Sequence, residues 1–407
     1  MTTPQHADDF LHDLRLRSAA EDGIFWIDDE RLAIFEPEAA RRVSAVNWKH
    51  YVMHDRLIDM VRRRTSTPVP WARIRAAWLA QLHGLATAEH NDRLLTRMER
   101  IIDARLGDDV DLVMLTQEVA LRSMLPVALS GITDAEAALV GRDLDQKLLR
   151  LVSRDEGGAW HHLKFVAVQV RSGLVVRRVL RDRASGKRPR RQDLADPIVD
   201  LLPELGMDRA LDVVTTVLTA IGGPPGVAAA SLLYEFARHP EWEERITAEL
   251  RELSRADFCA APTGAAPVTH RFVKEVLRLW SPPLLLVRRS LFPFDLGGTR
   301  LEKGQWYLLS PHMIHRDPRV WKEPDSFDPD RFLPGAPHGP ADRGCYVPFG
   351  WAPKKCVGAG IGTVQLMALC YLLCGRYRLT VPDADSVTMA FRFAPVPENF
   401  SGRLVTR

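Results

Sequence analysis

The sequence predicts one large domain spanning residues 1–407, mainly α-helical with minor β structure in small sheets at its N-terminal and C-terminal sides. Apolar residues recur at three- and four-residue intervals through much of the first half, as they do on the buried face of a helix. Short alternating stretches bounded by Gly, Pro and Asp occur near both ends and indicate strands. No internal repeat and no long linker separates the chain into smaller domains.

The first half of the chain contains one hairpin followed by helices. Residues 23–35 predict two short strands joined by an Asp-Asp-Glu turn. Residues 36–180 are mostly helical in pattern. The basic run 181–193 contains Gly and Pro, which favours a solvated connecting loop. We expect a long helix to begin near Met207, to be interrupted, and to resume after Pro225.

The second half alternates between helices and short strands. Residues 250–268 are rich in small residues and predict a loop. A helix over 269–280 stops at a Ser-Pro-Pro sequence. Residues 292–310 alternate around Gly-Gly and Lys-Gly, which predicts a small sheet. A Pro-rich meander follows over 315–348. The last apolar helix ends at Gly375, before strands that lead to the C-terminus.

Charge and cysteine content exclude some classes of protein. Lys and Arg total 55 against 52 Asp and Glu, a net charge of +3, so we expect no nucleic-acid partner. The polar N-terminus predicts neither a signal peptide nor a membrane anchor, and hence a soluble, cytoplasmic protein without a membrane partner. Five cysteines at irregular spacing are a poor disulfide framework. Of these, Cys370 and Cys374 lie in a Leu-rich run and are expected to be buried apolar side chains.

The most informative cysteine is Cys356. It follows a loop marked by Pro and Gly, and it directly precedes an apolar helix. A thiolate at that point is stabilised by the positive end of the helix dipole and by nearby peptide N–H groups. Small residues at Gly350, Ala352 and Gly358 would let a flat macrocycle approach the backbone closely. A buried structural cysteine is the alternative if this motif is taken alone.

This segment resembles the cysteine-ligand loop of cytochromes P450, in which Phe is followed by Gly, by Cys seven residues after the Phe, and then by Gly. Here these positions are Phe349, Gly350, Cys356 and Gly358. The resemblance implies haem b as cofactor, Cys356 as its iron ligand, and Phe349 and Gly358 beside the ring. Two positions depart from the family pattern. Ala352 replaces a usual Gly, and Lys354 replaces the His or Arg that contacts a haem propionate.

A second set of residues resembles the structural ion cluster of the same family. Glu275 and Arg278 match its Glu-x-x-Arg motif, and Arg331 matches the arginine of its meander. Alone, Glu and Arg three apart on a helix are usually a solvated pair. A third partner is what a buried ion network would need. The resemblance implies that these residues hold the meander against the ligand loop.

Further matches concern the haem propionates. Trp71 and Arg75 fit the family's Trp-x-x-x-Arg helix, where the indole N–H and the guanidinium donate to a propionate. Arg288 lies where the family has another propionate-binding arginine, with Arg289 as the adjacent alternative. The order and spacing of these motifs across 71–358 identify the chain as a member of the soluble, bacterial-type P450s.

One region departs from the family. Residues 220–225, Ala-Ile-Gly-Gly-Pro-Pro, align with Ala-Gly-x-(Asp/Glu)-Thr, whose acid and alcohol deliver protons during oxygen activation. Gly223 and Pro224 have neither an acid nor an alcohol side chain and cannot deliver protons. We expect the helix to be broken here, with carbonyls freed near 219–221. The alternative is that the two prolines only exaggerate a bend that the family already has. By resemblance, the substrate pocket includes Ala220, Gly223, Pro224 and Leu284.

The resemblance implies a P450-type oxidoreductase, a monooxygenase of specialised metabolism acting on a small organic metabolite. Electrons would come from a separate ferredoxin and ferredoxin reductase, which Lys354, Lys355 and Arg73 would attract. The missing acid–alcohol pair leaves two alternatives open. One is a haem enzyme that uses peroxide, or that catalyses rearrangement, dehydration or nitrogen-group transfer. The other is a catalytically silent haem-binding or carrier-docking protein.

Overall fold

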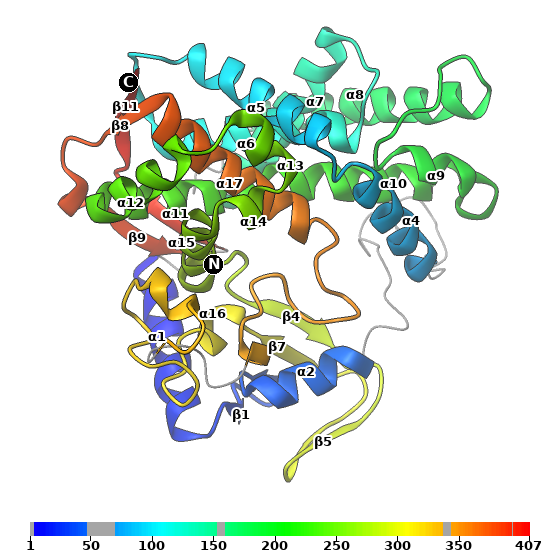
Figure 1. Ribbon diagram of the computed structural model, residues 1–407. Helices are drawn as coiled ribbons and strands as arrows, with labels where there is room; N and C mark the ends of the chain where they lie inside the picture. The colour runs from blue at the N-terminus through cyan, green and yellow to red at the C-terminus, as the bar shows by residue number, and fades with distance from the viewer. Residues whose placement is uncertain (1–3, 47–69, 153–158, 337–342, 393) are drawn as a thin grey trace. The chain divides into compact units, whose positions relative to one another are not determined.

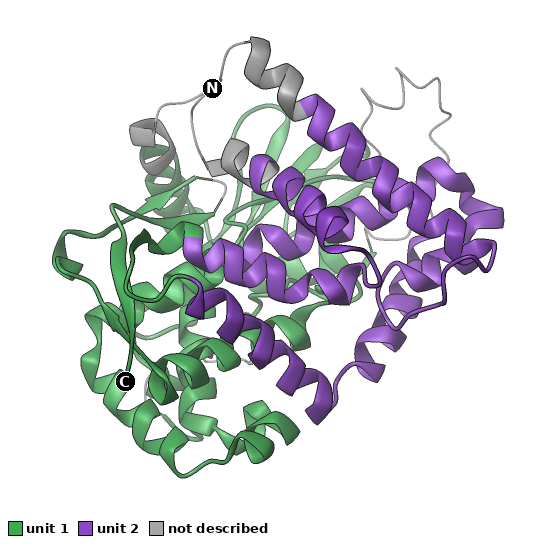
Figure 2. Cartoon of the chain, turned by 90° about the horizontal axis from the view of Figure 1, so that it is seen from above, with its two compact units in different colours: residues 1–50, 105–114, 227–407 green, residues 51–104, 115–226 purple. Residues whose placement is uncertain are grey.

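The computed structural model describes residues 4–46, 70–152, 159–336, 343–392 and 394–407 (Figure 1). The chain divides into two compact units, which Figure 2 distinguishes by colour. Unit 1 comprises residues 1–50, 105–114 and 227–407, and unit 2 comprises residues 51–104 and 115–226. Folding of the whole chain as one domain stays a prediction.

The N-terminal part of unit 1 forms a four-stranded sheet. Its strand order is β1-β2-β7-β4. The hairpin predicted over 23–35 is confirmed, because β1 and β2 pair antiparallel with Phe25 opposite Ala33. The parallel pairing of β2 with β7 then joins this hairpin to a segment far along the chain. The bounds are α1 (Pro4–Ala20), β1 (Ile24–Trp26), β2 (Arg31–Ile34), α2 (Pro37–Val46), β4 (Leu286–Arg289) and β7 (Trp306–Leu309).

Three smaller sheets complete the β structure described for unit 1. Strands β5 and β6 form a hairpin that extends away from the rest of the unit, as Figure 1 shows in yellow. Its turn contains Gly297 and Gly298, both with positive φ, a conformation that favours glycine. The others have strand orders β3-β11-β8 and β10-β9. The bounds are β3 (Asp109–Asp111), β5 (Phe294–Leu296), β6 (Thr299–Leu301), β8 (Tyr377–Thr380), β9 (Thr388–Phe391), β10 (Pro395–Glu398) and β11 (Ser401–Thr406).

The helices of unit 1 include the two that carry the strongest sequence motifs. Helix α15 ends at Trp280, since Ser281 is extended and two prolines follow it. Helix α17 ends at Gly375, as the sequence predicts. The bounds are α11 (Pro224–Arg238, in unit 1 from Val227), α12 (Pro240–Arg251), α13 (Arg255–Ala260), α14 (Pro262–Ala265), α15 (Pro267–Trp280), α16 (Pro311–Ile314), η1 (Pro329–Phe332), η2 (Arg343–Cys345), α17 (Ala359–Gly375) and η3 (Ala384–Ser386).

Unit 2 is helical. Its longest apolar helix, α10, packs against α7, α8 and α9. Gly206 has positive φ inside α10, so regular helical geometry begins at Met207, where the sequence places the helix start. The bounds are α4 (Trp71–Gly84), α5 (Ala88–Asp103), α6 (Leu112–Ala128, in unit 2 from Leu115), α7 (Asp134–Val152), α8 (Ala159–Ala184), α9 (Asp196–Asp200) and α10 (Leu202–Gly222).

The run 181–193 is mostly exposed and connects α8 to α9, as the sequence predicts. Two of its residues depart from that expectation, since Arg183 and Asp193 form a fully buried bidentate ion pair at 2.7 and 2.8 Å. Asp193 also accepts from the Ser130 amide, and Arg190 pairs with two aspartates of α9. The loop expected over 250–268 also contains the short helices α13 and α14.

Within the described residues, Leu202–Arg238 is long and apolar enough to cross a membrane, with a mean hydropathy of 1.4. This stretch comprises α10 and α11. Of its most apolar window, 61% is buried inside the protein. A helix whose apolar surface is mostly covered by protein is a core helix, and its composition needs no bilayer to explain it.

Candidate active site

The loop before α17 presents the thiol of Cys356 at the surface of unit 1. Of the five cysteines, all within the described residues, Cys356 alone is exposed. Its amide donates to the Phe349 carbonyl at 2.8 Å, which closes the loop. Gly350 allows this closure, because its φ of 72° is in the left-handed region. The exposed thiol is therefore held on a tightly folded loop.

The same thiol lies just before the N-terminus of α17. The helix starts at Ala359, and the Ala359 amide donates to the Cys356 carbonyl at 3.4 Å. A Cβ atom at Gly358 would lie 3.8 Å from Cys356 Sγ, so any larger side chain there would crowd the sulfur. The helix dipole favours negative charge at this end. The geometry suits a thiolate that binds a metal.

Two basic side chains meet beside this loop. Burial, together with the positive charge of Arg288, lowers the pKa of Lys354 to about 8. Arg288 lies on β4, far from Lys354 in sequence, yet their charges interact. Two half-buried cations near each other favour an anion between them. This donor set fits a carboxylate such as a haem propionate.

Strand geometry distinguishes Arg288 from its neighbour. Successive residues of a strand point to opposite faces. The Arg289 Nε donates to the Gly304 carbonyl at 2.8 Å, and its guanidinium lies 5.7 Å from the centre of the Trp306 ring. Arg289 is thereby engaged on the face away from Lys354. This alternation supports Arg288, rather than Arg289, as the propionate-binding arginine.

In unit 2, α4 carries the other two predicted propionate ligands. Trp71 is the first residue of the helix, and Arg75 lies one turn later on the same face. The Trp71 ring contacts Trp78 edge to face, with 5.7 Å between ring centres. The Trp78 Nε1 donates to the Leu194 carbonyl at 2.9 Å, which anchors α4. Trp71 and Arg75 thus lie on one face of α4, and their contact with haem stays a prediction.

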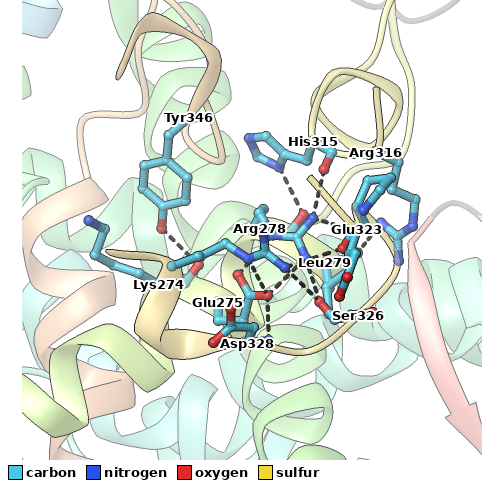
Figure 3. A network of polar contacts seen from close by, with 12 residues as sticks. Lys274, Glu275, Arg278, Leu279, His315, Arg316, Glu323, Ser326, Asp328 and Tyr346 are labelled. Atoms are coloured by element: carbon cyan, nitrogen blue, oxygen red, sulfur yellow. Dashed lines mark hydrogen bonds and ion pairs between the residues drawn. The ribbon is translucent and has the colours of Figure 1, made fainter. Parts of the chain in front are cut away.

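Beneath the ligand loop lies a fully buried ion cluster, shown in Figure 3. Arg278 Nε and Nη2 each donate to Glu275 at 2.8 Å, and Arg331 Nε donates to Glu275 at 3.0 Å. All three side chains are buried. The remaining N–H groups donate to carbonyls of the meander. These acceptors are His315, Lys322, Glu323, Pro324 and Ser326.

His315 connects this ion cluster to the ligand loop, a role that the sequence interpretation missed. Its Nδ1 lies 2.9 Å from the Arg278 carbonyl, which can only accept, so Nδ1 carries the proton. Its Nε2 accepts from the Val347 amide at 2.8 Å. Burial and the nearby arginines lower the pKa of His315 to about 3, which keeps the ring neutral. Tyr346, beside Val347, donates to the Lys274 carbonyl at 3.1 Å.

In unit 2, the helix is broken where the sequence predicts it. Helix α10 ends at Gly222 and α11 begins at Pro224. The Gly223 amide still donates to the Thr219 carbonyl, at 3.4 Å. The carbonyls without a donor four residues later are those of Ala220 and Ile221, because Pro224 and Pro225 have no N–H. The prolines thus remove the helical donors of these two carbonyls, while Thr219 keeps its donor. That the two carbonyls are free to bind another molecule stays a prediction.

A family model for cytochrome P450 matches residues 164–399, which is more than half of the chain. The chain belongs to the cytochrome P450 family. These proteins are haem-iron oxidoreductases whose haem b is held by a cysteine thiolate. The mainly helical fold with small sheets is confirmed. Haem b is accordingly the cofactor of this P450.

Curated relatives and solved structures agree with this assignment. Cyclooctatin synthase of Streptomyces melanosporofaciens is 35% identical over 170 residues, 41% of this chain and 37% of that protein. Cyclooctat-9-en-7-ol 5-monooxygenase of the same organism is 29% identical, over 43% of this chain and 38% of that protein. The matched stretches thus span less than two fifths of these relatives. A zebra fish cytochrome P450 with abiraterone has the same fold (TM-score 0.77, 18% identity, 97% of this chain and 98% of that chain).

The predicted pocket residues of this P450 lie in different surroundings. Ala220 is exposed, and Gly223 and Pro224 are half-buried, all in unit 2. Leu284, in unit 1, is 1% exposed and packs in a core cluster with Leu308, while Leu285 and Phe391 lie at the margin of that cluster. Leu284 is therefore a core residue of unit 1. The pocket-lining role of all four residues stays a prediction.

Proposed function

We propose that this P450 is a cytoplasmic monooxygenase of specialised metabolism, which oxidises a small apolar metabolite with electrons from a ferredoxin and its reductase. The observation that carries the proposal is the exposed thiol of Cys356 on its closed loop before α17. Two relatives whose names concern cyclooctatin and cyclooctat-9-en-7-ol support an apolar substrate. Both come from one Streptomyces species, which supports specialised metabolism.

In this proposal, each site residue has one task. Cys356 ligates the iron, and Phe349 and Gly358 lie beside the ring. Arg288, Lys354, Trp71 and Arg75 neutralise the propionates. When bound, the haem supplies the oxygen-activating chemistry. The electron donor binds near Lys355, which is exposed, whereas Arg73 already pairs with Glu204. That pairing weakens Arg73 as a docking residue, because its charge is compensated.

Proton delivery in this proposal differs from the family pattern. Gly223 and Pro224 carry neither an acid nor an alcohol. The carbonyls of Ala220 and Ile221 can accept hydrogen bonds, so they can hold a water molecule or a substrate hydroxyl that donates to them. Pro224→Thr would restore an N–H and close part of the break. We expect this variant to leave product formed per NADPH unimproved, while a gain in coupling with unchanged product would contradict the assignment.

Turnover with a complete electron supply tests the proposed function. Candidate apolar metabolites are first screened by the shift of the Soret band that accompanies displacement of an axial water. Those that bind are incubated with NADPH, ferredoxin, ferredoxin reductase and isotopically labelled oxygen gas. The proposal predicts a product that contains one labelled oxygen atom. Absence of labelled product from every metabolite that binds would overturn it.

A second function is favoured by the break itself. Loss of both proton-donating side chains suits an enzyme that uses peroxide, or that acts on an already oxidised substrate by rearrangement, dehydration or nitrogen-group transfer. Product formed with hydrogen peroxide, or from such a substrate without reductant, would assign this function. A protein that binds haem and fails in both assays would be catalytically silent.

A further inference from the structure

One face of α6 lies against the break between α10 and α11, within unit 2. Gln117 on this helix is 3% exposed, and Leu121 lies one turn later on the same face. The Gln117 Nε2 donates to the Gly223 carbonyl at 3.4 Å. A Cβ atom at Gly222 would lie 3.6 Å from Leu121 Cδ1, an ordinary packing distance. Two residues of α6 thus contact the break, one polar and one apolar.

The approach of Gln117 requires glycine at position 226. A Cβ atom there would lie 2.0 Å from Gln117 Oε1, 2.3 Å from its Cδ and 2.8 Å from its Cα. These distances leave no room for a side chain unless Gln117 and its backbone move. The Gln117 amide therefore spans the break. Its nitrogen contacts the Gly223 carbonyl, and its oxygen lies over Gly226.

The backbone at the break lacks two of the hydrogen bonds that a continuous helix would have. Pro224 and Pro225 deprive Ala220 and Ile221 of their donors, and the bond from the Gly223 amide to Thr219 is long, at 3.4 Å. The bond from Gln117 comes from outside the helix and adds a restraint at the residue where the two helices meet. A leucine at position 117 would fill the same buried volume, so packing alone does not explain why an amide is present there.

We propose that Gln117 is a positioning residue: it fixes the direction of the Ala220 and Ile221 carbonyls, which hold the water or substrate hydroxyl that takes the place of the family's acid–alcohol pair. This inference rests on the proposed function. A carbonyl accepts but does not donate, so the molecule held there is the donor of the proton. In this role Gln117 acts through the backbone, by its bond to the Gly223 carbonyl.

The test compares two substitutions on the same face of α6 in the haem-loaded protein. Gln117→Leu keeps the volume and removes the amide, whereas Leu121→Ala removes packing against Gly222 and keeps the amide. For Gln117→Leu we expect amide hydrogen exchange over 215–228 to become about fivefold faster, as loss of one hydrogen bond implies. We also expect the low-spin ferric electron paramagnetic resonance spectrum to shift. The control, Leu121→Ala, should lower the unfolding midpoint at least as much and leave that spectrum unchanged.

A third variant provides a measurement that a change in packing would not alter. In Gln117→Glu, a protonated carboxyl group can donate to the Gly223 carbonyl, while a carboxylate cannot. Burial should raise the pKa of the introduced carboxyl. The ferric spectrum of this variant should match wild type at low pH and match Gln117→Leu at high pH. The wild-type spectrum should not change over the same pH range.

Two results would overturn the proposal. One is a wild-type spectrum and wild-type exchange in Gln117→Leu, and the other is a spectral shift in Leu121→Ala equal to that in Gln117→Leu. Both readouts need haem but no turnover. If the spectra behave as expected while the wild type fails to oxidise any ligand with ferredoxin, the positioning role stands and the proposed function falls. Labelled product together with unshifted spectra would overturn the positioning role and leave the proposed function standing.

Discussion

The ion cluster beneath the ligand loop and the helix break in unit 2 illustrate two ways to hold irregular backbone. In the cluster, Glu275 binds two arginines, and these donate to five meander carbonyls, so each segment is held by several bonds. At the break, prolines remove the helical donors of two carbonyls, and the Gln117 amide donates to the Gly223 carbonyl at 3.4 Å. Redundant bonds make a rigid scaffold, whereas a helix broken by prolines loses helical donors for its carbonyls.

The largest effect is expected at the ion cluster. Glu275→Ala leaves two buried guanidinium groups without their carboxylate, which costs about 3–5 kcal/mol of unfolding free energy. The matched control is Glu38→Ala, which removes an exposed carboxylate that also pairs with an arginine three residues away. Chemical denaturation of both variants checks the prediction. Equal loss in the two variants would show that the cluster is not a scaffold.

A smaller loss is expected at the break. Gly226→Ala forces the new methyl group against Gln117, and overpacking of this kind costs about 1–3 kcal/mol. Gly360→Ala is the control, because a methyl group there meets no atom within 4 Å. Denaturation midpoints give the comparison. If Gly226→Ala were as stable as its control, the close approach of α6 would not be a constraint.

Lys354 should contribute to haem retention. Lys354→Met removes one cation of the pair near Arg288, so we expect haem affinity to fall on the order of tenfold. Because the pKa of Lys354 is lowered to about 8, the positive charge of Lys354 lowers the unfolding free energy of the haem-free protein below pH 8. As pH rises from 8 toward the ordinary lysine pKa, Lys354 loses its proton in the folded protein and this unfolding free energy increases. Haem transfer to a competing apoprotein and pH-dependent unfolding measure the two effects, and an unchanged affinity would contradict the propionate assignment.

The smallest effect at neutral pH is expected at His315, whose contribution also depends on pH. Its pKa is lowered to about 3, so the unfolded chain binds a proton near pH 6.5 that the folded protein does not bind. The stability it contributes is complete above pH 6.5 and is lost progressively as pH falls toward 3. His315→Gln should be less stable than wild type by about 1 kcal/mol at pH 7. The difference should shrink with acidification, and a constant difference would contradict the link between Arg278 and Val347.

Local patterns predict much of this molecule from sequence. The hairpin over 23–35, the end of α15 at Trp280, the end of α17 at Gly375 and the break after Gly222 all follow from turn residues, prolines and glycines. The partnership of Glu275, Arg278 and Arg331 is implied by the resemblance of their motifs to those of the P450 family. These features depend on short-range backbone chemistry or on residues whose order resembles a known family.

Features that depend on contacts between distant segments could not be predicted. Arg183 looked solvated because its partner Asp193 is buried only after α8 and α9 pack. His315 gains its role from two backbone groups in other segments, and Gln117 gains its role from a glycine more than a hundred residues later. Single residues of this kind carry no periodicity, so no sequence pattern identifies them.

The thiolate assignment is tested most directly by the spectrum of the reduced carbon monoxide complex. Wild-type protein should show the red-shifted Soret band that marks cysteinate ligation in this family. Cys356→Ser should bind haem and lack this band, because the other four cysteines are buried and cannot replace the exposed thiol. Single Ser substitutions of Cys259, Cys345, Cys370 and Cys374 should each keep it. A red-shifted band that persists in Cys356→Ser would contradict the account.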